Sequence, residues 1–369
     1  MTIVLFILVL ALLILTHELG HFIVAKLSGI RVDEFGLGLP PKVFGVKKGE
    51  TTYSINALPF GGFVKIFGED PNEENTSGPD SARSFVHKPK WIQALVLAAG
   101  VTFNLIFAWI LISINLMIGM PVATDGGVPA GMTVHREMLA VVNVLKDSPA
   151  ALGGIKAGDQ LISLSSGQEK VVNLSADSVR TFVKKFPNQE VKVEYSRKGL
   201  LATSSVLTVI PKTNSSSSDA MIGIAMQKIG LVSAAWWKAP CYGLYFSYHL
   251  IVNTFLSFGD FFSMIATEGQ GALAAVSGPI GIYGLMNDAT KMGLVYILNF
   301  MVIISVNLAI INLLPFPALD GGRLLFVAIE AVIRRPIKPV IANTLNMIGF
   351  GLLLLLMAVI AISDIFKLL

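Results

Sequence analysis

Four long apolar stretches, separated by polar sequence, organise this chain of 369 residues. A helix needs about 20 apolar residues to cross the hydrocarbon core of a bilayer, and each stretch is long enough. The pattern predicts four transmembrane helices, within residues 1–27, 91–120, 291–322 and 345–369. The first stretch also has the length of a secretory signal. Because no Lys or Arg precedes its apolar core and no small-residue cleavage pattern follows, we expect an uncleaved helix.

Residues 28–90 form a polar loop between the first two predicted helices. Between Arg31 and Phe67, short apolar and aromatic pieces alternate with Gly and Pro. This pattern is typical of β-hairpin strands rather than of a helix. We therefore expect a hairpin region inside this loop.

Residues 121–228 have the mixed charge and the short apolar runs of a soluble domain. About 100 residues are enough for one small domain. One helical piece is expected over Ala176–Lys185, and four segments alternate apolar and polar residues with the period of a strand: 141–145, 160–164, 191–195 and 205–210. The pattern predicts an α+β domain.

Residues 229–290 combine an apolar segment, 234–262, with a connector. The segment is apolar enough to cross a membrane, but Trp236, Trp237 and Lys238 begin it and several Tyr residues follow. Aromatic residues of this kind gather at the membrane–water interface. We expect an amphipathic helix that lies at the membrane surface, and a fifth membrane span is the alternative.

Loop charge predicts how the chain crosses the membrane. Lys and Arg are concentrated in the loops 28–90 and 323–344, and positively charged loops remain in the cytosol. The domain 121–228 and both ends of the chain are then expected outside. The predicted fold is an α-helical membrane protein with about four transmembrane helices, a β-hairpin region and one extracytoplasmic α+β domain.

Composition agrees with a membrane protein and excludes other classes. The chain is 53% hydrophobic and 14% charged, whereas soluble domains carry about 25% charged residues. The net charge is +4, and its Lys and Arg are spread over loops, so nucleic-acid binding has no support. The single cysteine, Cys241, excludes an internal disulfide and a zinc site built from several thiolates.

One polar cluster, His17-Glu18-Leu19-Gly20-His21, lies inside the first apolar stretch. Residues four apart share a face of a helix, so both imidazoles point the same way. This spacing lets two ring nitrogens bind one Zn²⁺ while Glu18 lies beside the metal and handles the proton of a water molecule. Ionisable groups are costly inside a membrane, so this cluster predicts a function rather than an ordinary polar turn.

Two His residues leave room for a third protein ligand, and Asp320 is the candidate. At about 1.5 Å per residue, His17 lies about 24 Å along its helix. Asp320 closes the third apolar stretch, so both residues are expected in the cytosolic third of the bilayer. Pro315 and Pro317 break the helix there and free backbone groups that need protein or water around them. Taken alone, Asp320 also fits an ordinary Asp-Gly-Gly turn.

The two motifs together resemble the site-2 protease family of zinc intramembrane metalloproteases. The likeness rests on His17-Glu18-Leu19-Gly20-His21 and on Asn312-Leu313-Leu314-Pro315-Phe316-Pro317-Ala318-Leu319-Asp320-Gly321. It covers essentially the whole chain, including residues 59–65, 85–91 and 277–280. More narrowly, the chain resembles the bacterial members that cleave a membrane-spanning anti-sigma factor in the sigma-E envelope stress response.

The resemblance implies the chemistry of the site. His17, His21 and Asp320 would ligate Zn²⁺, the implied cofactor. Glu18 would act as general base and then give the proton to the leaving amine. A zinc metalloendopeptidase of this kind is an enzyme that hydrolyses peptide bonds within transmembrane segments.

The resemblance also implies where the substrate is held. Asn312 would hold the unwound substrate backbone, and so would Asn307 and Pro315 on the same segment. The strand formed by Gly61, Gly62, Phe63 and Val64 would pair with the substrate, and residues 35–39 would enter the membrane. A Gly-rich hairpin without a substrate role is the alternative for both pieces.

The outer domain resembles a single PDZ module. Residues 148–162 are close to the module's small-residue helical turn, which is followed by a Gly-Asp turn into a strand. Such modules bind peptides by strand addition. The better-known enterobacterial relative carries two modules, and this chain has room for one. It also departs from the family at Val101, where a Pro is common after the Gly.

Two hypotheses follow. The favoured one is a protease of the bacterial inner membrane that cuts single-span membrane proteins already trimmed outside, such as an anti-sigma factor, or remnant signal peptides. The alternative is a membrane-anchored PDZ adaptor whose metal site is structural, which predicts a fourth protein ligand near His21 or Asp320. The sequence offers none. A zinc transporter would need intramembrane His and acidic residues on several helices, and one cluster is present.

Overall fold

The computed structural model describes residues 2–70, 73–197, 204–214, 217–268 and 278–368. The chain forms two compact units. The first contains Met1–Ser113, Pro240–Thr290 and Ile297–Leu369, and the second contains Ile114–Ala239 with Lys291–Tyr296. The connector predicted after the segment 234–262 lies partly outside the described residues.

The first unit contains the long apolar helices. Five helices among the described residues have the length and composition to cross a membrane. They are α1 (Thr2–Leu27), α3 (Lys90–Ile118), α6 (Ala239–Glu268), α9 (Leu294–Leu313) and α11 (Pro339–Leu368). Shorter helices connect them: α2 (Glu73–Ser77), η1 (Ser81–Arg83), η2 (Phe85–His87), α8 (Pro279–Met292) and α10 (Asp320–Ile333).

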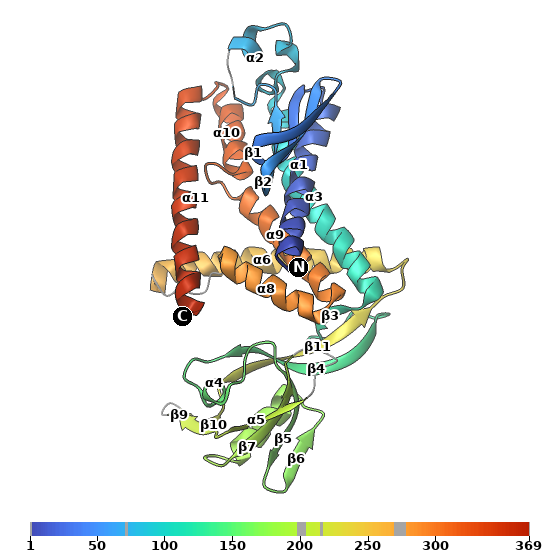
Figure 1. Cartoon of the computed structure of the whole chain (residues 1–369), viewed down its shortest axis with the longest axis vertical. Helices are drawn as coiled ribbons and strands as arrows, with labels where there is room; N and C mark the ends of the chain where they lie inside the picture. Colours follow the sequence, from blue (N-terminus) through green and yellow to red (C-terminus); the bar gives the residue numbers. More distant parts are fainter. Residues whose placement is uncertain (1, 71–72, 198–203, 215–216, 269–277, 369) are drawn as a thin grey trace. The chain divides into compact units, whose positions relative to one another are not determined.

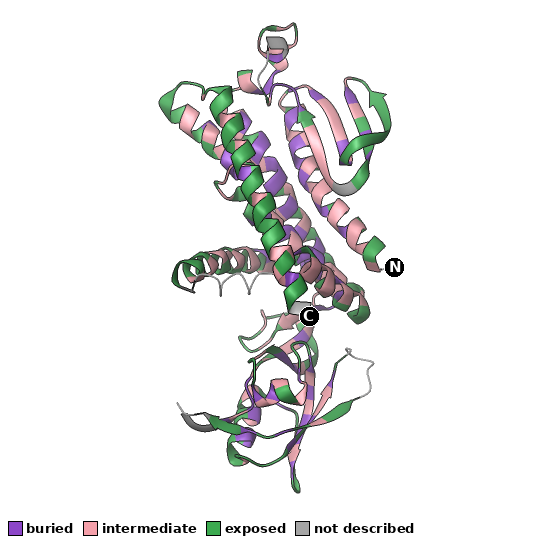
Figure 2. Ribbon diagram, turned by 60° about the vertical axis from the view of Figure 1, so that its left-hand side comes forward, coloured by how far each residue is buried: buried purple, intermediate pink, exposed green. Residues whose placement is uncertain are grey.

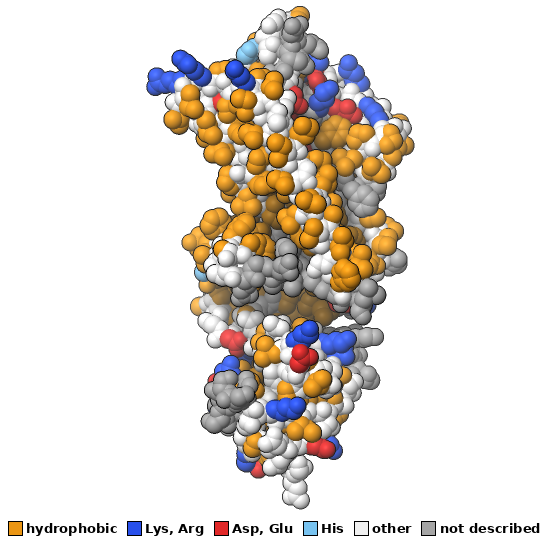
Figure 3. Space-filling view, turned by 90° about the vertical axis from the view of Figure 1, so that its left-hand side faces the viewer, with side chains coloured by type: hydrophobic (Ala, Val, Ile, Leu, Met, Phe, Trp, Pro, Cys, Tyr) orange, Lys and Arg blue, Asp and Glu red, His pale blue; other side chains and the backbone are white. Residues whose placement is uncertain are grey.

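The surface of this unit is apolar, as expected for a protein that faces lipid. Figure 3 shows hydrophobic side chains over the face that α11 presents. Residues exposed on α11 include Val340, Met347, Phe350 and Leu355. Because lipid replaces water around such a helix, an exposed apolar face is favourable in the bilayer.

Helix α6 corresponds to the segment predicted to lie at the membrane surface. In Figures 1 and 2 it runs crosswise to α1, α3 and α11. Trp109 Nε1 donates a hydrogen bond to Pro240 O over 2.9 Å, and Gly243 lies against Ser113, so the start of α6 contacts α3. Its length and hydropathy also suit a membrane span. The surface position stays a prediction.

A buried stripe on α1 positions the His residues. Val9, Leu13, His17, His21 and Ala25 recur every four residues and are all buried. This buried stripe faces α3, and the two helices approach each other closely at Gly20. A Cβ at that position would lie 2.4 Å from Ala99 O. His17 and His21 therefore lie on the face of α1 that packs against protein.

The predicted hairpin region is confirmed and contains more pairings than a simple hairpin. Strands β1 (Val32–Lys48) and β2 (Thr51–Ile66) pair through three sets of residues. Residues 42–48 pair with 51–56, residues 52–58 pair with 34–39, and residues 34–37 pair with 62–65. The segment 62–65, which we call the edge segment, pairs on one side with β1. No strand of the described residues pairs with its other side.

The predicted third membrane span, 291–322, is two helices with an irregular loop between them. α9 ends at Leu313, before the first Pro of the motif, and Asp320 is the first residue of α10. The segment 323–344, predicted as a cytoplasmic loop, contains most of α10, which continues to Ile333, and the start of α11 at Pro339. α10 forms because its apolar residues recur at helical spacing without an internal Pro.

The second unit is built on a seven-stranded sheet with the order β3-β11-β4-β5-β7-β8, and β6 pairs with β5. A two-stranded sheet pairs β9 with β10. The predicted helix is α5 (Ala176–Lys185), and the four predicted strands are parts of β4, β5, β7 and β8. The elements are β3 (Met120–Ala123), β4 (Thr133–Val144), α4 (Pro149–Gly153), β5 (Gln160–Ser166), β6 (Glu169–Val172), β7 (Val191–Ser196), β8 (Ser205–Val209), β9 (Lys212–Asn214), β10 (Ser217–Met221) and β11 (Ile224–Ser233).

A buried ion pair holds the turn between α4 and β5. Asp159 is fully buried and accepts hydrogen bonds from Arg197 Nε and Nη2, each over 2.7 Å. The same guanidinium donates to Gly154 O over 2.6 Å, and Lys156 N donates to Asp159. The carboxylate raises the pKa of Arg197. This pair fixes the Gly-Asp turn that leads into β5.

We expect Asp159→Ala to destabilise the second unit by about 1–3 kcal/mol, because Lys156 N and the Arg197 guanidinium lose the carboxylate that accepts their hydrogen bonds. Hydrogen exchange over residues 133–233 in the full chain measures this as faster exchange. Glu169→Gln is the control, since Glu169 and Lys185 form an exposed pair, and such pairs contribute about 0–1 kcal/mol. Equal exchange in the two variants would contradict the role of Asp159.

Candidate metal centre and active site

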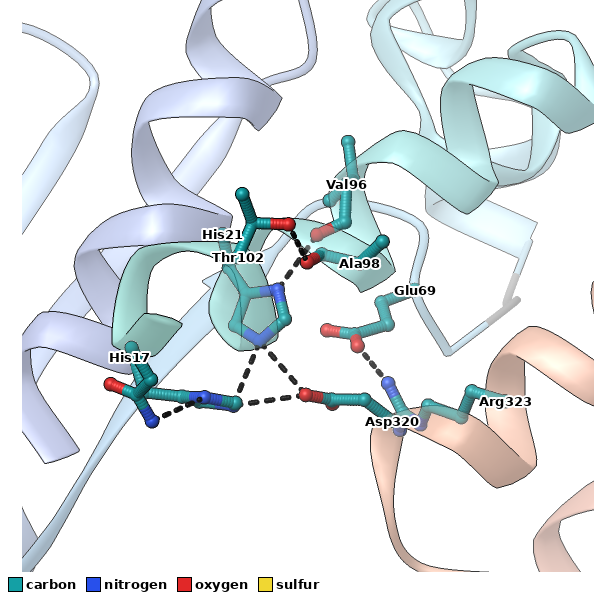
Figure 4. A network of polar contacts seen from close by, with 9 residues as sticks. His17, His21, Glu69, Val96, Ala98, Thr102, Asp320 and Arg323 are labelled. Atoms are coloured by element: carbon teal, nitrogen blue, oxygen red, sulfur yellow. Dashed lines mark hydrogen bonds and ion pairs between the residues drawn. The ribbon is translucent and has the colours of Figure 1, made fainter. Parts of the chain in front are cut away.

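Three side chains from two distant parts of the chain converge at one point. His17 Nε2 lies 2.9 Å from Asp320 Oδ2, and His21 Nε2 lies 3.2 Å from the same oxygen. The two Nε2 atoms are 3.2 Å apart. Figure 4 shows both imidazoles of α1 facing the carboxylate at the start of α10. Among the described residues, this is the group of His, Cys and acidic side chains arranged to hold a metal ion.

The distances fit a tetrahedral metal. Zinc bonds of about 2.0–2.1 Å place tetrahedral ligand atoms about 3.3 Å from one another. The three observed separations, 2.9 to 3.2 Å, are close to this value. Both His residues are buried. Two imidazoles and one carboxylate are also the donor types of catalytic zinc sites, which keep a fourth position open.

Polar groups on α3 contact the two His rings and orient them. Val96 O lies 2.8 Å from His21 Nδ1, so this nitrogen donates and Nε2 keeps its lone pair for a metal. The amide of Asn104 lies 3.4 Å from His17 Nδ1. Asn104 is fully buried, and its Oδ1 has no hydrogen-bond partner when Nδ2 faces the ring. Reversing this amide lets Oδ1 accept from the Nδ1–H of His17.

In the reversed orientation, Oδ1 pairs with the Nδ1–H of His17, which leaves His17 Nε2 free to bind a metal, as in His21. Both His residues can then present Nε2 to a metal at the three-residue cluster.

Gly100 lets α3 approach the rings. A Cβ at this position would lie 2.4 Å from His21 Nε2 and 2.7 Å from His17 Nε2. Val96, Gly100 and Asn104 are four residues apart, so they lie on one face of α3. The sequence analysis noted this Gly only for the Pro that is missing after it, and it gave no role to Gly100 or to the carbonyl of Val96. A Gly and an Asn four residues apart in an apolar helix were the available signal.

Tight backbone packing fixes the third member of the cluster. A Cβ at Gly321 would lie 2.3 Å from the carbonyl oxygens of Leu313 and Leu314, and one at Gly322 would lie 2.2 Å from Phe316 O. Asn346 of α11 also accepts a hydrogen bond from Ala318 N over 3.2 Å. The loop after α9 therefore folds back on itself and carries the first turn of α10 to α1.

Glu18 lies between the cluster and the edge segment. A backbone hydrogen bond joins Val64 to the Glu18 carboxylate. A Cβ at Gly62 would lie 3.3 Å from Glu18 Cγ. Gly62 and Val64 are two apart in a strand, so their backbone groups point to the same side. The unpaired side of the edge segment therefore faces Glu18.

Two cavities meet at Glu18 and Asp320. The larger, about 490 Å³, is lined by Phe63 and Val64 on one side and by Ala318 and Leu319 on the other. The smaller, about 230 Å³, lies toward α9 and is lined by Ile14, His17, Glu18, Leu308, Asn312, Ala318, Leu319 and Asp320. The site thus has room for a peptide on both sides of the cluster.

Of the seven predicted substrate residues, Asn312, Phe63 and Val64 line these cavities and the other four do not. Asn312 lines the smaller cavity together with Leu308, four residues earlier on the same helical face. Asn307 is five residues earlier, so it points elsewhere and its Nδ2 donates to Ile303 O. Pro315 is exposed in the loop. Gly61 precedes the edge segment, with a φ of 110° that favours Gly.

We expect Asn104→Leu to weaken zinc binding about 10–100-fold, because the Nδ1–H of His17 loses its acceptor. Competition with a chelator measures the affinity without any cleavage assay. Asn104→Asp is the matched control, since a carboxylate also accepts from the imidazole and should retain most of the affinity. Wild-type affinity in Asn104→Leu would show that Asn104 does not orient the ligand.

Comparison with known proteins identifies the family. The model of peptidase family M50 matches residues 5–356. The chain belongs to peptidase family M50. It is 34% identical over 358 residues to a Clostridium perfringens protein that carries a zinc-metalloprotease name, covering 96% of this chain and 95% of that protein.

Two further relatives match along their whole length. The zinc metalloprotease RasP of Shouchella clausii is 26% identical over 443 residues, with 100% of this chain and 99% of that protein covered. The regulator of sigma-W protease RasP of Bacillus subtilis is 29% identical over 443 residues, with the same coverage. This M50 peptidase is therefore a zinc metalloprotease, and the predictions of an enzyme and of zinc are confirmed.

Proposed function

We propose that this M50 peptidase hydrolyses peptide bonds within transmembrane segments of single-span membrane proteins. The observation that supports it best is the position of the polar cluster. His17, Glu18 and His21 lie on a helix that otherwise has the composition of a membrane span, and the cavities beside them are next to an unpaired strand edge. Such groups are costly in a membrane unless they have a function there.

His17, His21 and Asp320 would hold the zinc ion through Nε2, Nε2 and Oδ2. Zinc supplies a Lewis acid and makes water nucleophilic near neutral pH. Glu18 would take the proton of the attacking water on its carboxylate and return it to the leaving amine. The described residues place no fourth His, Cys or acidic side chain at the cluster. This supports an open catalytic site over the structural site that a non-catalytic adaptor would need.

The edge segment and Asn312 would hold the substrate. A transmembrane helix must lose its own hydrogen bonds before one of its amides reaches the metal, and its freed groups then need new partners. Gly62 and Val64 offer backbone groups on the free side of the edge segment, with Phe63 beside them, so a substrate strand can be added there. Gly61, Asn307 and Pro315 remain proposed substrate residues, although none of them lines the two cavities.

Substrates and orientation are further parts of the proposal. The name of the Bacillus subtilis relative assigns that protein to regulation of sigma-W. We infer the same substrate class here, an anti-sigma factor shortened on its outer side, with remnant signal peptides as a second class. The peptidase would lie in the bacterial inner membrane, with the PDZ-like second unit and both ends outside, and that unit would exclude bulky intact substrates.

The size of the outer part of a substrate tests this proposal. We expect the purified protein in nanodiscs to cleave a single-span substrate that has a short outer segment. The same substrate with a folded outer domain should be cleaved much more slowly, because the second unit excludes it. Gel analysis of both substrates over time measures the ratio. Equal rates would contradict a requirement for prior trimming.

A further inference from the structure

An ion pair joins the two walls of the larger cavity. Glu69 Oε1 contacts Arg323 Nη1, and both residues line the cavity. Figure 4 shows the pair next to Asp320 and outside the metal cluster. Asp70 lies nearby, with its Oδ1 3.8 Å from Arg323 Nη2. The metal cluster and the known family activity leave this pair without an assigned role.

Glu69 is attached firmly to the edge segment. β2 ends at Ile66, and a tight turn follows in which Glu69 N donates to Ile66 O over 3.2 Å. Gly68 within this turn has a φ of 79°, and Ser84 lies against it. Phe67 is hydrogen-bonded to both Arg31 and Phe85 through its backbone. A force on Glu69 is therefore passed to the strand that ends three residues earlier.

Arg323 is attached equally firmly to Asp320. The two residues are three apart in the first turn of α10, and the Gly pair between them packs on backbone carbonyls of the preceding loop. This turn cannot shift without carrying the carboxylate with it. The ion pair consequently connects the strand beside Glu18 to the turn that holds the third member of the metal cluster.

The pair is enclosed rather than fully exposed. The side chains of Arg323 and Glu69 are 32% and 21% exposed. Solvent screens such a pair less than one on an open surface, and exposed pairs contribute little. The pair joins two rigid elements, so it affects the distance between them as well as the stability of the fold.

We propose that the Glu69–Arg323 ion pair sets the width of the cleft between the edge segment and the loop before Asp320. Glu69 and Arg323 are positioning residues, since neither touches the metal cluster. The inference rests on the proposed function in one respect, because the cleft is taken to receive the substrate backbone. Holding the two walls at one distance would keep an added substrate strand in register with Glu18.

The first test measures kinetics in the full chain. Glu69→Gln and Arg323→Gln should each raise KM for a single-span substrate about 10-fold with a smaller change in kcat, because binding of the strand is weakened throughout the reaction. Zinc content should stay near that of the wild type. The charge-swapped variant E69R/R323E should recover most of the affinity. Arg335→Gln, on an exposed residue beyond the same helix, is the matched control.

The second test measures the cleft itself and needs no cleavage. Spin labels at Lys65→Cys and Ala328→Cys, in a Cys241→Ser background, report the separation between the edge segment and α10 by pulsed electron resonance. Arg323→Gln should broaden the distance distribution toward longer values, and the charge swap should narrow it again. A distance distribution that stays unchanged in both single variants would overturn the proposal, whatever happens to KM.

The two tests also separate this inference from the proposed function. If the wild type cleaved no single-span substrate, the proposed function would fail, and the distance measurement would still decide whether the pair sets the cleft. If the wild type cleaved normally and the distances did not respond to the substitutions, the inference alone would fail.

Discussion

Glu18→Gln is expected to bind zinc as the wild type does and to cleave a single-span substrate about 10²–10⁴-fold more slowly. The amide has the shape of the carboxylate but can neither take a proton from water nor return one to the leaving amine. The metal cluster does not include Glu18, so its three members remain in place. Zinc analysis and a cleavage assay on the same preparation measure the two effects.

The separation of these two effects is what makes the substitution informative. Glu169→Gln, on an exposed acidic residue of the second unit, should leave both values unchanged. Cleavage by Glu18→Gln at the wild-type rate would remove Glu18 from the chemistry. Loss of zinc in the same variant would show that Glu18 is a ligand instead of the acid–base group.

Asp320→Asn is expected to lose zinc and, with it, all measurable cleavage. The carboxylate is the anionic member of the cluster, and its Oδ2 lies within 3.2 Å of both Nε2 atoms. The loss of affinity should exceed the roughly 10–100-fold effect typical of a residue that only orients a ligand. The chelator competition used for Asn104→Leu measures it.

The order of affinities tests the assignment of the third ligand. The wild type should bind zinc most tightly, Asn104→Leu less tightly, and Asp320→Asn least. Wild-type affinity in Asp320→Asn would mean that another group completes the site. In that case, the contact of α10 with α1 would serve only the stability of the fold.

Local patterns predicted the parts of this molecule whose structure depends on nearby residues. His17 and His21 are four residues apart, so the sequence places both imidazoles on one face of α1. Short runs of alternating apolar and polar residues predicted parts of β4, β5, β7 and β8, and α5 begins at a Ser capping box. Each of these signals lies within one element.

Features that depend on distant packing could not be predicted. The role of Gly100 depends on how closely α3 crosses α1, and the pairing of β1 with β2 depends on bends within each strand. The charged ends of α10 suggested a loop, although the helix is held in place by Gly321 and Gly322 against the preceding loop. Glu69 and Arg323 are 254 residues apart, and neither carries a motif.

The position of the cut bond tests the central claim most directly. The wild-type protein in nanodiscs, given a shortened single-span substrate, should produce two fragments whose new ends are found by mass spectrometry. We expect a cut inside the apolar span that is removed by chelation, restored by zinc and absent in Glu18→Gln. A cut confined to the polar flanks, or one that persists without zinc, would contradict it.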